Sequence, residues 1–147
     1  MTDQKCMDCP EQTLSNERAV AVLVAAGLRP TAQRVILTCL LFCKGTYRHT
    51  TAEELYARSI KAGCKVSLAT VYNTLHSFTK AGIIRQIATD STKVYFDTNP
   101  EEHYHFYDES TGELINIHDD LLKDLKLPPL PKGAILCSVD LLVRIRS

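Results

Sequence analysis

One amphipathic segment, residues 67–82, constrains the fold of this chain more than any other. Its apolar residues recur three or four positions apart, the spacing that places side chains on one face of an α-helix. Ser67 is a favourable N-cap, and Gly82 is a favourable C-terminal stop. The segment therefore predicts a helix with a buried apolar stripe and a polar outward face. The stripe is Leu68, Val71, Leu75 and Phe78, and the outward face is Thr70, Asn73, His76, Ser77 and Lys80.

The outward face of this predicted helix has the composition of a surface that reads DNA. Small polar residues allow a close approach to base edges, and an asparagine amide such as that of Asn73 matches adenine in the major groove. An ordinary amphipathic surface helix would have a similar outward face. The neighbouring sequence therefore decides between the two interpretations.

Three shorter helices are predicted before this segment and a β-hairpin after it. The predicted helix caps are Ser15, Thr31 and either Thr50 or Thr51, the last two each followed by glutamate three residues on. After the long helix, residues 83–88 and 93–97 are β-prone and are joined by a turn at residues 89–92. Helices followed by such a hairpin predict a winged helix-turn-helix domain.

Charge is unevenly distributed along a chain whose formal net charge is zero. Residues 17–93 carry eleven Lys and Arg against four Asp and Glu, whereas residues 94–147 carry five basic against ten acidic residues. A net charge of +7 in the segment with the helix-turn-helix pattern favours binding to phosphate, and the acidic second half would be repelled by it.

The second half of the chain predicts a small, separate layer. Short strands are expected at residues 104–107 and 113–117, a helix at 118–127 and a last strand at 134–145. Because this layer is too thin to be stable alone, we expect an edge-to-edge homodimer. The sequence thus predicts an α+β fold with a flexible tail at residues 1–14, a winged-helix DNA-binding domain at 15–98 and an α/β dimerisation domain at 101–147.

Cellular location and redox state can also be predicted. No apolar run approaches the roughly 20 residues that span a bilayer, and the acidic N-terminal segment does not resemble a signal peptide. We therefore expect a cytoplasmic protein without membrane contact. The spacing of the six cysteines does not suggest a secreted disulfide framework, so free thiols or ligands of metal or haem are expected. Cys39, Cys43 and Cys64 are expected to be core thiols.

Histidine spacing indicates a metal site. His103 and His105 are two residues apart, so on a strand both imidazoles project from one face. Asp97 precedes them by one strand, and His49 lies just before the third helix. Three histidines and a carboxylate suit Fe(II), Mn(II) or Zn(II), although an isolated His-x-His is more often a surface pair.

Several motifs in the sequence occur together in the order typical of one protein family. They are Leu28-Arg-Pro-Thr-Ala-Gln-Arg34, His49-Thr-Thr-Ala-Glu-Glu-Leu-Tyr56, Ser67-Leu-Ala-Thr-Val-Tyr-Asn-Thr-Leu75, Ala81-Gly-Ile-Ile84, Phe96-Asp97 and His103-Tyr-His105. Together they resemble the ferric uptake regulator family from about Ser15 to the C-terminus, which implies a dimeric, metal-responsive transcription regulator.

Within that family, the chain is most similar to the iron response regulator subfamily. The similarity lies in Asn73, in Lys93-Val-Tyr-Phe-Asp-Thr-Asn99 and in the missing cysteine pairs. It implies a regulator of iron and haem metabolism.

The resemblance also implies site residues. The family's regulatory metal ligands match His49, Asp97, His103 and His105, but a further carboxylate falls on Asn116, an uncharged ligand. Where many relatives bind structural zinc with two Cys-x-x-Cys pairs, Asp108 and Thr111 replace the first pair and only Cys137 remains near the C-terminus. We therefore expect no four-cysteine structural zinc.

The N-terminal Cys9-Pro10 resembles the short haem regulatory motif, in which a cysteine thiolate ligates haem iron. With the subfamily resemblance, this predicts haem binding at Cys9, with His103 and His105 as candidates for a second haem contact. Cys6 precedes Cys9 by three residues in a Cys-x-x-Cys spacing, so the two could instead form a redox pair or half of a metal site.

The resulting expectation is a sequence-specific, homodimeric regulator of iron and haem homeostasis without catalytic activity. It would bind a palindromic operator in double-stranded DNA and respond to haem or a divalent metal. The alternatives are a peroxide-sensing Fe(II)- or Mn(II)-dependent repressor of the same family, a haem- or metal-binding protein with no DNA role, and a His/Asp metal hydrolase. The expected DNA contacts are Arg29, Arg34, Thr70, Tyr72, Asn73 and Lys80.

Overall fold

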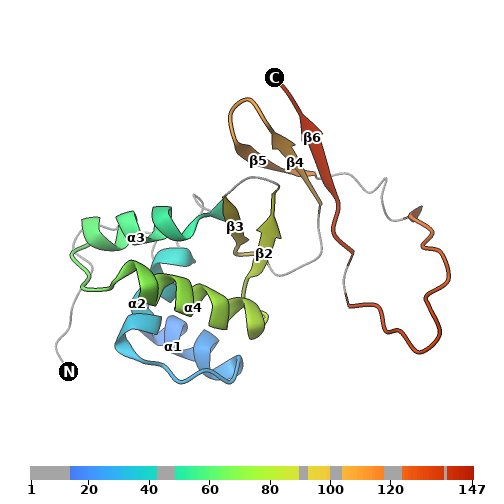
Figure 1. Cartoon of the computed structure of the whole chain (residues 1–147). Coiled ribbons are helices and arrows are strands. Elements are labelled where there is room, and N and C mark those ends of the chain that lie inside the picture. Colours follow the sequence, from blue (N-terminus) through green and yellow to red (C-terminus); the bar gives the residue numbers. More distant parts are fainter. Residues whose placement is uncertain (1–13, 43–48, 90–92, 100–103, 118–123, 138) are drawn as a thin grey trace. The chain divides into compact units, whose positions relative to one another are not determined.

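The computed structural model (Figure 1) describes residues 14–42, 49–89, 93–99, 104–117, 124–137 and 139–147. The chain divides into two units, Met1–Pro100 and Glu101–Ser147. Among the described residues, no helix is long and apolar enough to cross a membrane.

The described part of the first unit contains four helices. They are α1 (Asn16–Ala25), α2 (Ala32–Leu41), α3 (Ala52–Lys61) and α4 (Leu68–Lys80). The predicted caps are confirmed, because the side chains of Ser15, Thr31, Thr51 and Ser67 each accept a hydrogen bond from the first turn of the following helix. Of the two candidates at α3, Thr51 is the cap and forms a capping box with Glu54.

The apolar face of α4 is the centre of the first unit's core. Val71, Leu75 and Phe78 are fully buried, as predicted, in a cluster with leucines of α1, α2 and α3. Leu68 is an exception: it lies at the first position of the helix and is only half-buried, whereas Thr74 on the same face is buried. After α4 the chain reverses at Gly82, whose φ of 77° is a conformation that glycine adopts without strain.

A three-stranded antiparallel sheet completes the first unit. Strand β2 (Arg85–Ala88) pairs with β3 (Val94–Asp97), which confirms the predicted hairpin with slightly shorter strands. The two-residue strand β1 (His49–Thr50), which the sequence did not predict, pairs with the other edge of β3. Helices α2, α3 and α4 followed by this sheet form the predicted winged helix.

The second unit is a sheet of strands β4 (Tyr104–Asp108), β5 (Glu113–Ile117) and β6 (Leu142–Ile145). Strand β4 is central, antiparallel to β5 and parallel to β6. The first two strands were predicted correctly.

Two expectations for the second unit are wrong in part. The last strand was predicted at residues 134–145 but covers only 142–145, because only these residues find a partner in β4. The helix expected at 118–127 is absent from residues 125–127. Leu127 precedes Pro128, and a residue before proline disfavours the helical conformation. Residues 118–123 of that prediction lie outside the described residues.

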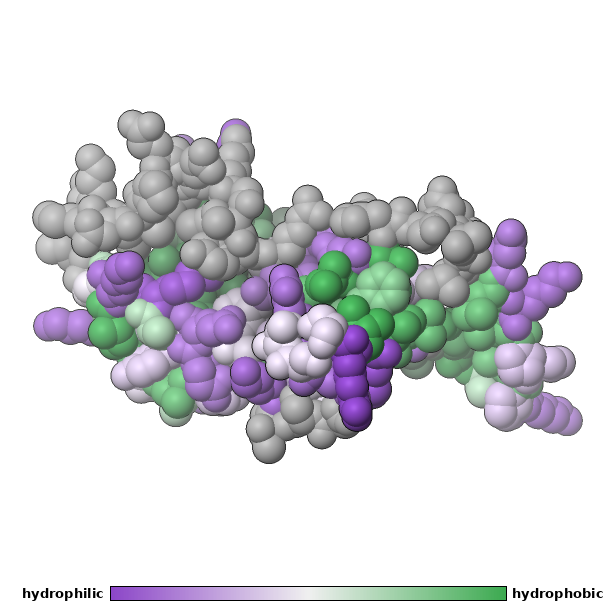
Figure 2. Space-filling model, turned by 90° about the horizontal axis from the view of Figure 1, so that it is seen from above, coloured by the Kyte–Doolittle hydropathy of each residue, from purple (hydrophilic) through white to green (hydrophobic). Residues whose placement is uncertain are grey.

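The second unit exposes large apolar side chains, which contribute to the green surface in Figure 2. Their exposed fractions run from 40% at Ile115 to 86% at Ile135. An apolar surface of this kind often marks a protein interface. The exposed residues are Ile115, Leu125, Leu127, Leu130, Ile135 and Leu136.

Candidate functional site

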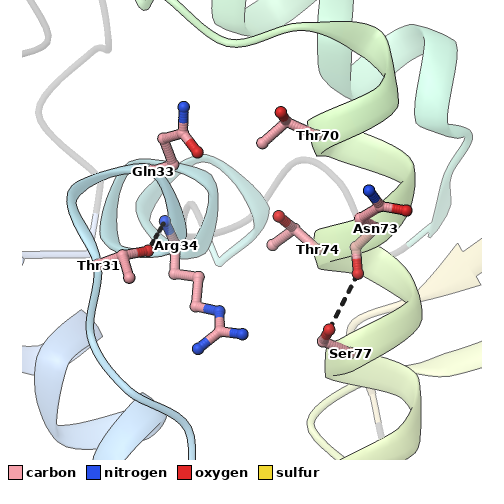
Figure 3. Close-up of a pocket in the computed structure, with 7 residues that line it drawn as sticks. All are labelled: Thr31, Gln33, Arg34, Thr70, Asn73, Thr74 and Ser77. Atoms are coloured by element: carbon pink, nitrogen blue, oxygen red, sulfur yellow. Dashed lines mark hydrogen bonds between the residues drawn. The ribbon is translucent and has the colours of Figure 1, made fainter.

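A polar groove lies between the N-terminal end of α2 and the outward side of α4. It has a volume of about 280 Å³, and every residue that lines it carries a hydrogen-bonding side chain. Figure 3 shows Thr70 and Thr74 pointing from α4 toward α2. A helix that offers hydroxyl and amide groups beside a basic residue has the chemistry to meet base edges and phosphate together. The lining residues are Thr31, Gln33, Arg34, Thr70, Asn73, Thr74 and Ser77.

Arg34 is the positive charge in this groove, and local hydrogen bonds position it. Its backbone N–H donates to the Thr31 hydroxyl over 3.3 Å, and its Nη1 donates to the Arg29 carbonyl oxygen over 3.0 Å. The guanidinium therefore lies against the turn before α2. Arg29 itself is exposed in that turn. Five guanidinium N–H groups in a planar fork suit a phosphate at this point.

The start of α4 is fixed by side-chain hydrogen bonds. The Ser67 hydroxyl accepts from the Thr70 backbone N–H over 3.1 Å and lies 2.9 Å from the Thr70 hydroxyl. Along the helix, the Ser77 hydroxyl donates to the Asn73 carbonyl oxygen over 3.0 Å, shown dashed in Figure 3. Asn73 and Lys80 are exposed. The Asn73 amide is thus presented to solvent from a helix held by its cap and its core.

Tyr72 is exposed on α4, and 42% of its surface is accessible. Its hydroxyl donates a hydrogen bond to Oε1 of Glu53 in the first turn of α3. This hydrogen bond, with lesser contributions from burial and from the Glu53 charge, raises the pKa of Tyr72 above its ordinary value. The phenol therefore stays protonated near neutral pH and acts as a donor.

Two predicted metal ligands meet in the first unit. Strands β1 and β3 place His49 directly opposite Asp97, and His49 Nε2 lies 3.0 Å from Asp97 Oδ2. Asp97 is fully buried, while the His49 side chain is 15% exposed. The second Asp97 oxygen, Oδ1, accepts the Asn99 backbone N–H over 2.9 Å. One buried carboxylate with a fixed orientation and one imidazole beside it are a suitable half of a transition-metal site.

The second unit holds two further candidates on neighbouring strands. His105 of β4 is 5% exposed and pairs in register with Asn116 of β5. The Asn116 Oδ1 atom is buried and has no hydrogen-bond partner among the described residues. A buried acceptor oxygen without a donor is costly. The oxygen of Asn116 is therefore suited to bind a cation.

Comparison with known proteins identifies the chain. The model of the ferric uptake regulator family matches residues 25–139, which is most of the sequence. The chain belongs to this family. Family members are metal-responsive transcription regulators rather than enzymes, and their fold combines an N-terminal winged-helix DNA-binding domain with a dimerisation domain.

Individual relatives agree with this assignment. The chain is 31% identical over 110 residues to the peroxide-responsive repressor PerR of Staphylococcus epidermidis, covering 75% of this chain and 72% of the relative. It is similar to the manganese-containing ferric uptake regulator of Pseudomonas aeruginosa, with 28% identity, a TM-score of 0.69 and coverage of 88% and 97%. The Vibrio cholerae ferric uptake regulator gives 26% identity, a TM-score of 0.68 and coverage of 90% and 100%.

Two of the predicted ligands, Cys9 for haem and His103 for haem or metal, lie outside the described residues. Haem binding at Cys9, with His103 or His105, stays a prediction from the sequence. The subfamily also stays a prediction, since the relative from Staphylococcus epidermidis carries the name of a peroxide-responsive repressor.

The positions that carry zinc-binding cysteines in many relatives are hydrogen-bonded here. The Asp108 carboxylate accepts the backbone N–H groups of Ser110 over 2.8 Å and Ser147 over 3.4 Å. A hydrogen bond with the Ser147 side chain lowers the pKa of Asp108 most, and the backbone N–H groups of Ser110 and Ser147 lower it further. The Thr111 hydroxyl accepts the Glu113 N–H over 3.2 Å. Asp108 thus ties the β4–β5 turn to the segment after β6, while Cys137 is exposed.

Three functional candidates were missed in the sequence. Gln33 and Thr74 line the groove, and Glu53 contacts Tyr72. Gln33 immediately precedes Arg34 and Thr74 lies one turn after Thr70, so both could have been inferred from their neighbours. Nothing local pairs Glu53 with Tyr72, which is nineteen residues away.

Proposed function

We propose that this protein is a cytoplasmic, homodimeric repressor that binds a palindromic operator in double-stranded DNA. Its affinity for that operator would depend on a divalent metal. The observation that carries the proposal is the groove beside α4, in which Asn73 and its neighbours form a polar surface on a winged helix. The net charge of +7 in residues 17–93 supports the same function, because it would release counterions from phosphate.

Two kinds of DNA contact are assigned to the named residues. Thr70 and Asn73 would face base edges from the exposed side of α4, as small polar residues do in a major groove. Arg29 in the turn before α2, Arg34 in the first turn of α2 and Lys80 at the end of α4 would contact phosphate. Tyr72 would contact a base beside those read by Asn73.

Replacing Asn73 by alanine tests this function. We expect affinity for an operator selected from random duplexes to fall about 10-fold to 100-fold, because a bidentate base contact is lost. Binding to unrelated duplexes should stay within about twofold. The measurement is a fluorescence-anisotropy titration at several salt concentrations, with the stoichiometry of two chains per operator checked by light scattering.

Two lysine variants accompany that titration. Lys80→Ala removes a proposed phosphate contact, and Lys61→Ala is the control outside the proposed surface. Lys80→Ala should weaken binding to all sequences alike and reduce the salt slope by about one, whereas Lys61, at the end of α3, should change neither value. A wild-type protein that binds every duplex equally would contradict the proposal, and would favour a metal- or haem-binding protein without a DNA role.

The regulatory metal is assigned to the predicted histidine and carboxylate ligands. In the first unit, His49 Nε2 lies 3.0 Å from Asp97 Oδ2. We propose that His103 and His105 of the second unit complete the site for Fe(II), Mn(II) or Zn(II). Bound by these residues, the cation would make the affinity for DNA depend on metal occupancy. Asn116 would add a neutral oxygen ligand.

Dimerisation is assigned to the second unit. Among the described residues of this unit, six large apolar side chains are exposed, and a three-stranded sheet buries little surface by itself. A second copy of the chain would cover these residues and give the twofold symmetry that a palindromic operator requires.

A second candidate within the family is a peroxide-sensing repressor. It is favoured by the 31% identity with a peroxide-responsive repressor. After treatment of the Fe(II)-loaded protein with hydrogen peroxide, this function predicts a mass increase of one oxygen atom on the peptide that contains His49 or His103. Mass spectrometry of a tryptic digest would detect it, and the Zn(II)-loaded protein is the control. Unmodified peptides after loss of DNA binding would exclude peroxide sensing at these ligands.

A further inference from the structure

The contact between Tyr72 and Glu53 joins an exposed side chain of α4 to the start of α3. Tyr72 would otherwise be free to rotate, since 42% of its surface is accessible. Its hydroxyl instead donates to the Glu53 carboxylate. An exposed tyrosine that is hydrogen-bonded at its far end keeps one orientation of its ring.

The position of Glu53 is itself well determined. It is the second residue of α3, and the neighbouring capping box fixes the helix start. In that box the Thr51 N–H donates to Glu54 Oε2 over 3.0 Å, and the Glu54 N–H donates to Thr51 Oγ1 over 3.2 Å. Helices α3 and α4 also pack against each other. The backbone of Glu53 is therefore held in place, with its exposed carboxylate within hydrogen-bonding reach of the Tyr72 hydroxyl.

The hydrogen bond changes what Tyr72 can offer to DNA. Because the hydroxyl is already donated to a carboxylate, the part of the side chain left for a ligand is the apolar ring. The raised pKa of Tyr72 agrees with this, since the phenol remains a neutral donor. In a major groove, the apolar group that a ring can contact is the methyl group of thymine.

The Glu53 carboxylate also needs an explanation near a DNA-binding surface. It is one of only four acidic residues among positions 17–93, and it lies next to the helix assigned to the groove. An acid at this point would repel phosphate and weaken binding. A neutral apolar residue at this position would not repel phosphate, but it could not accept the hydrogen bond of the Tyr72 hydroxyl.

We propose that Glu53 is a positioning residue that holds the Tyr72 ring against a thymine methyl group of the operator. The inference rests on the proposed function, because it requires that α4 enters the major groove. It adds a residue of α3 to those that determine operator sequence. It also divides the reading of DNA between neighbours: Asn73 recognises hydrogen-bonding edges, and Tyr72 recognises a methyl group.

A uracil scan of the operator tests this inference. Each thymine of a selected operator is replaced in turn by deoxyuridine, which lacks only the methyl group. For the wild-type protein we expect a loss of about fourfold in affinity at one position in each half-site, the effect of one buried methyl group. The loss should disappear in Tyr72→Ala.

Two variants of Glu53 separate positioning from charge. Glu53→Ala removes the acceptor. The ratio of the affinity for the thymine operator to that for the uracil operator, here called the thymine-to-uracil ratio, should then fall to about one. This should hold even if the overall affinity rises through loss of negative charge. Glu53→Gln keeps an oxygen that can accept the hydroxyl, so most of the ratio should be retained. Glu17→Ala, which removes another exposed acid of the first unit, should leave the ratio unchanged.

The outcomes distinguish the inference from the function on which it depends. If the wild-type protein selects no operator, the proposed function fails. If it selects an operator and Asn73→Ala weakens binding, but no uracil position matters or Glu53→Ala keeps the ratio, only the inference is overturned. A Tyr72→Phe variant that binds every duplex more weakly by the same factor would instead show that the hydroxyl contacts phosphate, which also overturns it.

Discussion

Asp97→Asn is expected to weaken divalent-metal binding at least about 100-fold. The substitution removes the only charged ligand proposed for the site, and even changes in residues behind a ligand commonly cost 10-fold to 100-fold in metal affinity. The fold should persist, since an asparagine oxygen can still accept the Asn99 N–H that Asp97 Oδ1 accepts. Isothermal titration with Mn(II), and operator binding with and without Mn(II), would measure the effect.

Two further variants sharpen the metal experiment. His76→Ala removes an exposed histidine of α4 that is outside the proposed site, so its Mn(II) affinity should match the wild type. Asn116→Asp adds a carboxylate where the buried Oδ1 has no described partner, so Mn(II) affinity should increase. Unchanged Mn(II) affinity in both Asp97→Asn and Asn116→Asp would exclude the assigned ligands.

Phe78→Ala should reduce the free energy of unfolding of the first unit by about 3–5 kcal/mol. Phe78 is fully buried in the cluster that joins α4 to the other helices, so its truncation leaves a cavity as well as losing apolar burial. This is a large part of the roughly 5–15 kcal/mol that stabilises a typical domain. Urea denaturation followed by circular dichroism would give the value, and operator binding should be lost at moderate temperature.

Lys80→Ala is the matched control for that core substitution. Lys80 lies two residues further along the same helix but is exposed, so its stability change should be within about 0.5 kcal/mol. A change below 1 kcal/mol for Phe78→Ala would mean that the apolar face of α4 does not hold the helix in place. Burial of that face would then not explain why Asn73 is exposed and available to contact base edges.

The helices of the first unit could be predicted because their signals are local. A cap and the first backbone N–H groups of its helix lie within a few residues, and burial repeats every three or four positions. For this reason Ser67, the stripe from Val71 to Phe78 and the hairpin were all recognised. His49 and Asp97 were candidate ligands by residue type and position, and the family resemblance then matched them to the regulatory metal ligands.

The second unit shows where local signals mislead. Residues 134–137 alternate enough to predict a strand, yet a strand exists only where a neighbour supplies hydrogen bonds, and of the segment 134–145 only residues 142–145 pair with β4. Conversely, His49–Thr50 is too short to be predicted, but becomes a strand because β3 lies beside it. Pairing partners are a property of the tertiary structure.

The amino-acid sequence alone determined the four helices with their caps, the outward polar face of α4, the basic character of the first unit and the family. Only the tertiary structure brought His49 to Asp97 across forty-eight positions, Arg34 beside α4 and Glu53 to Tyr72. The physical reason is one of range. Capping and helical periodicity act over about one turn of chain, whereas these contacts depend on how the apolar faces of separate elements pack together.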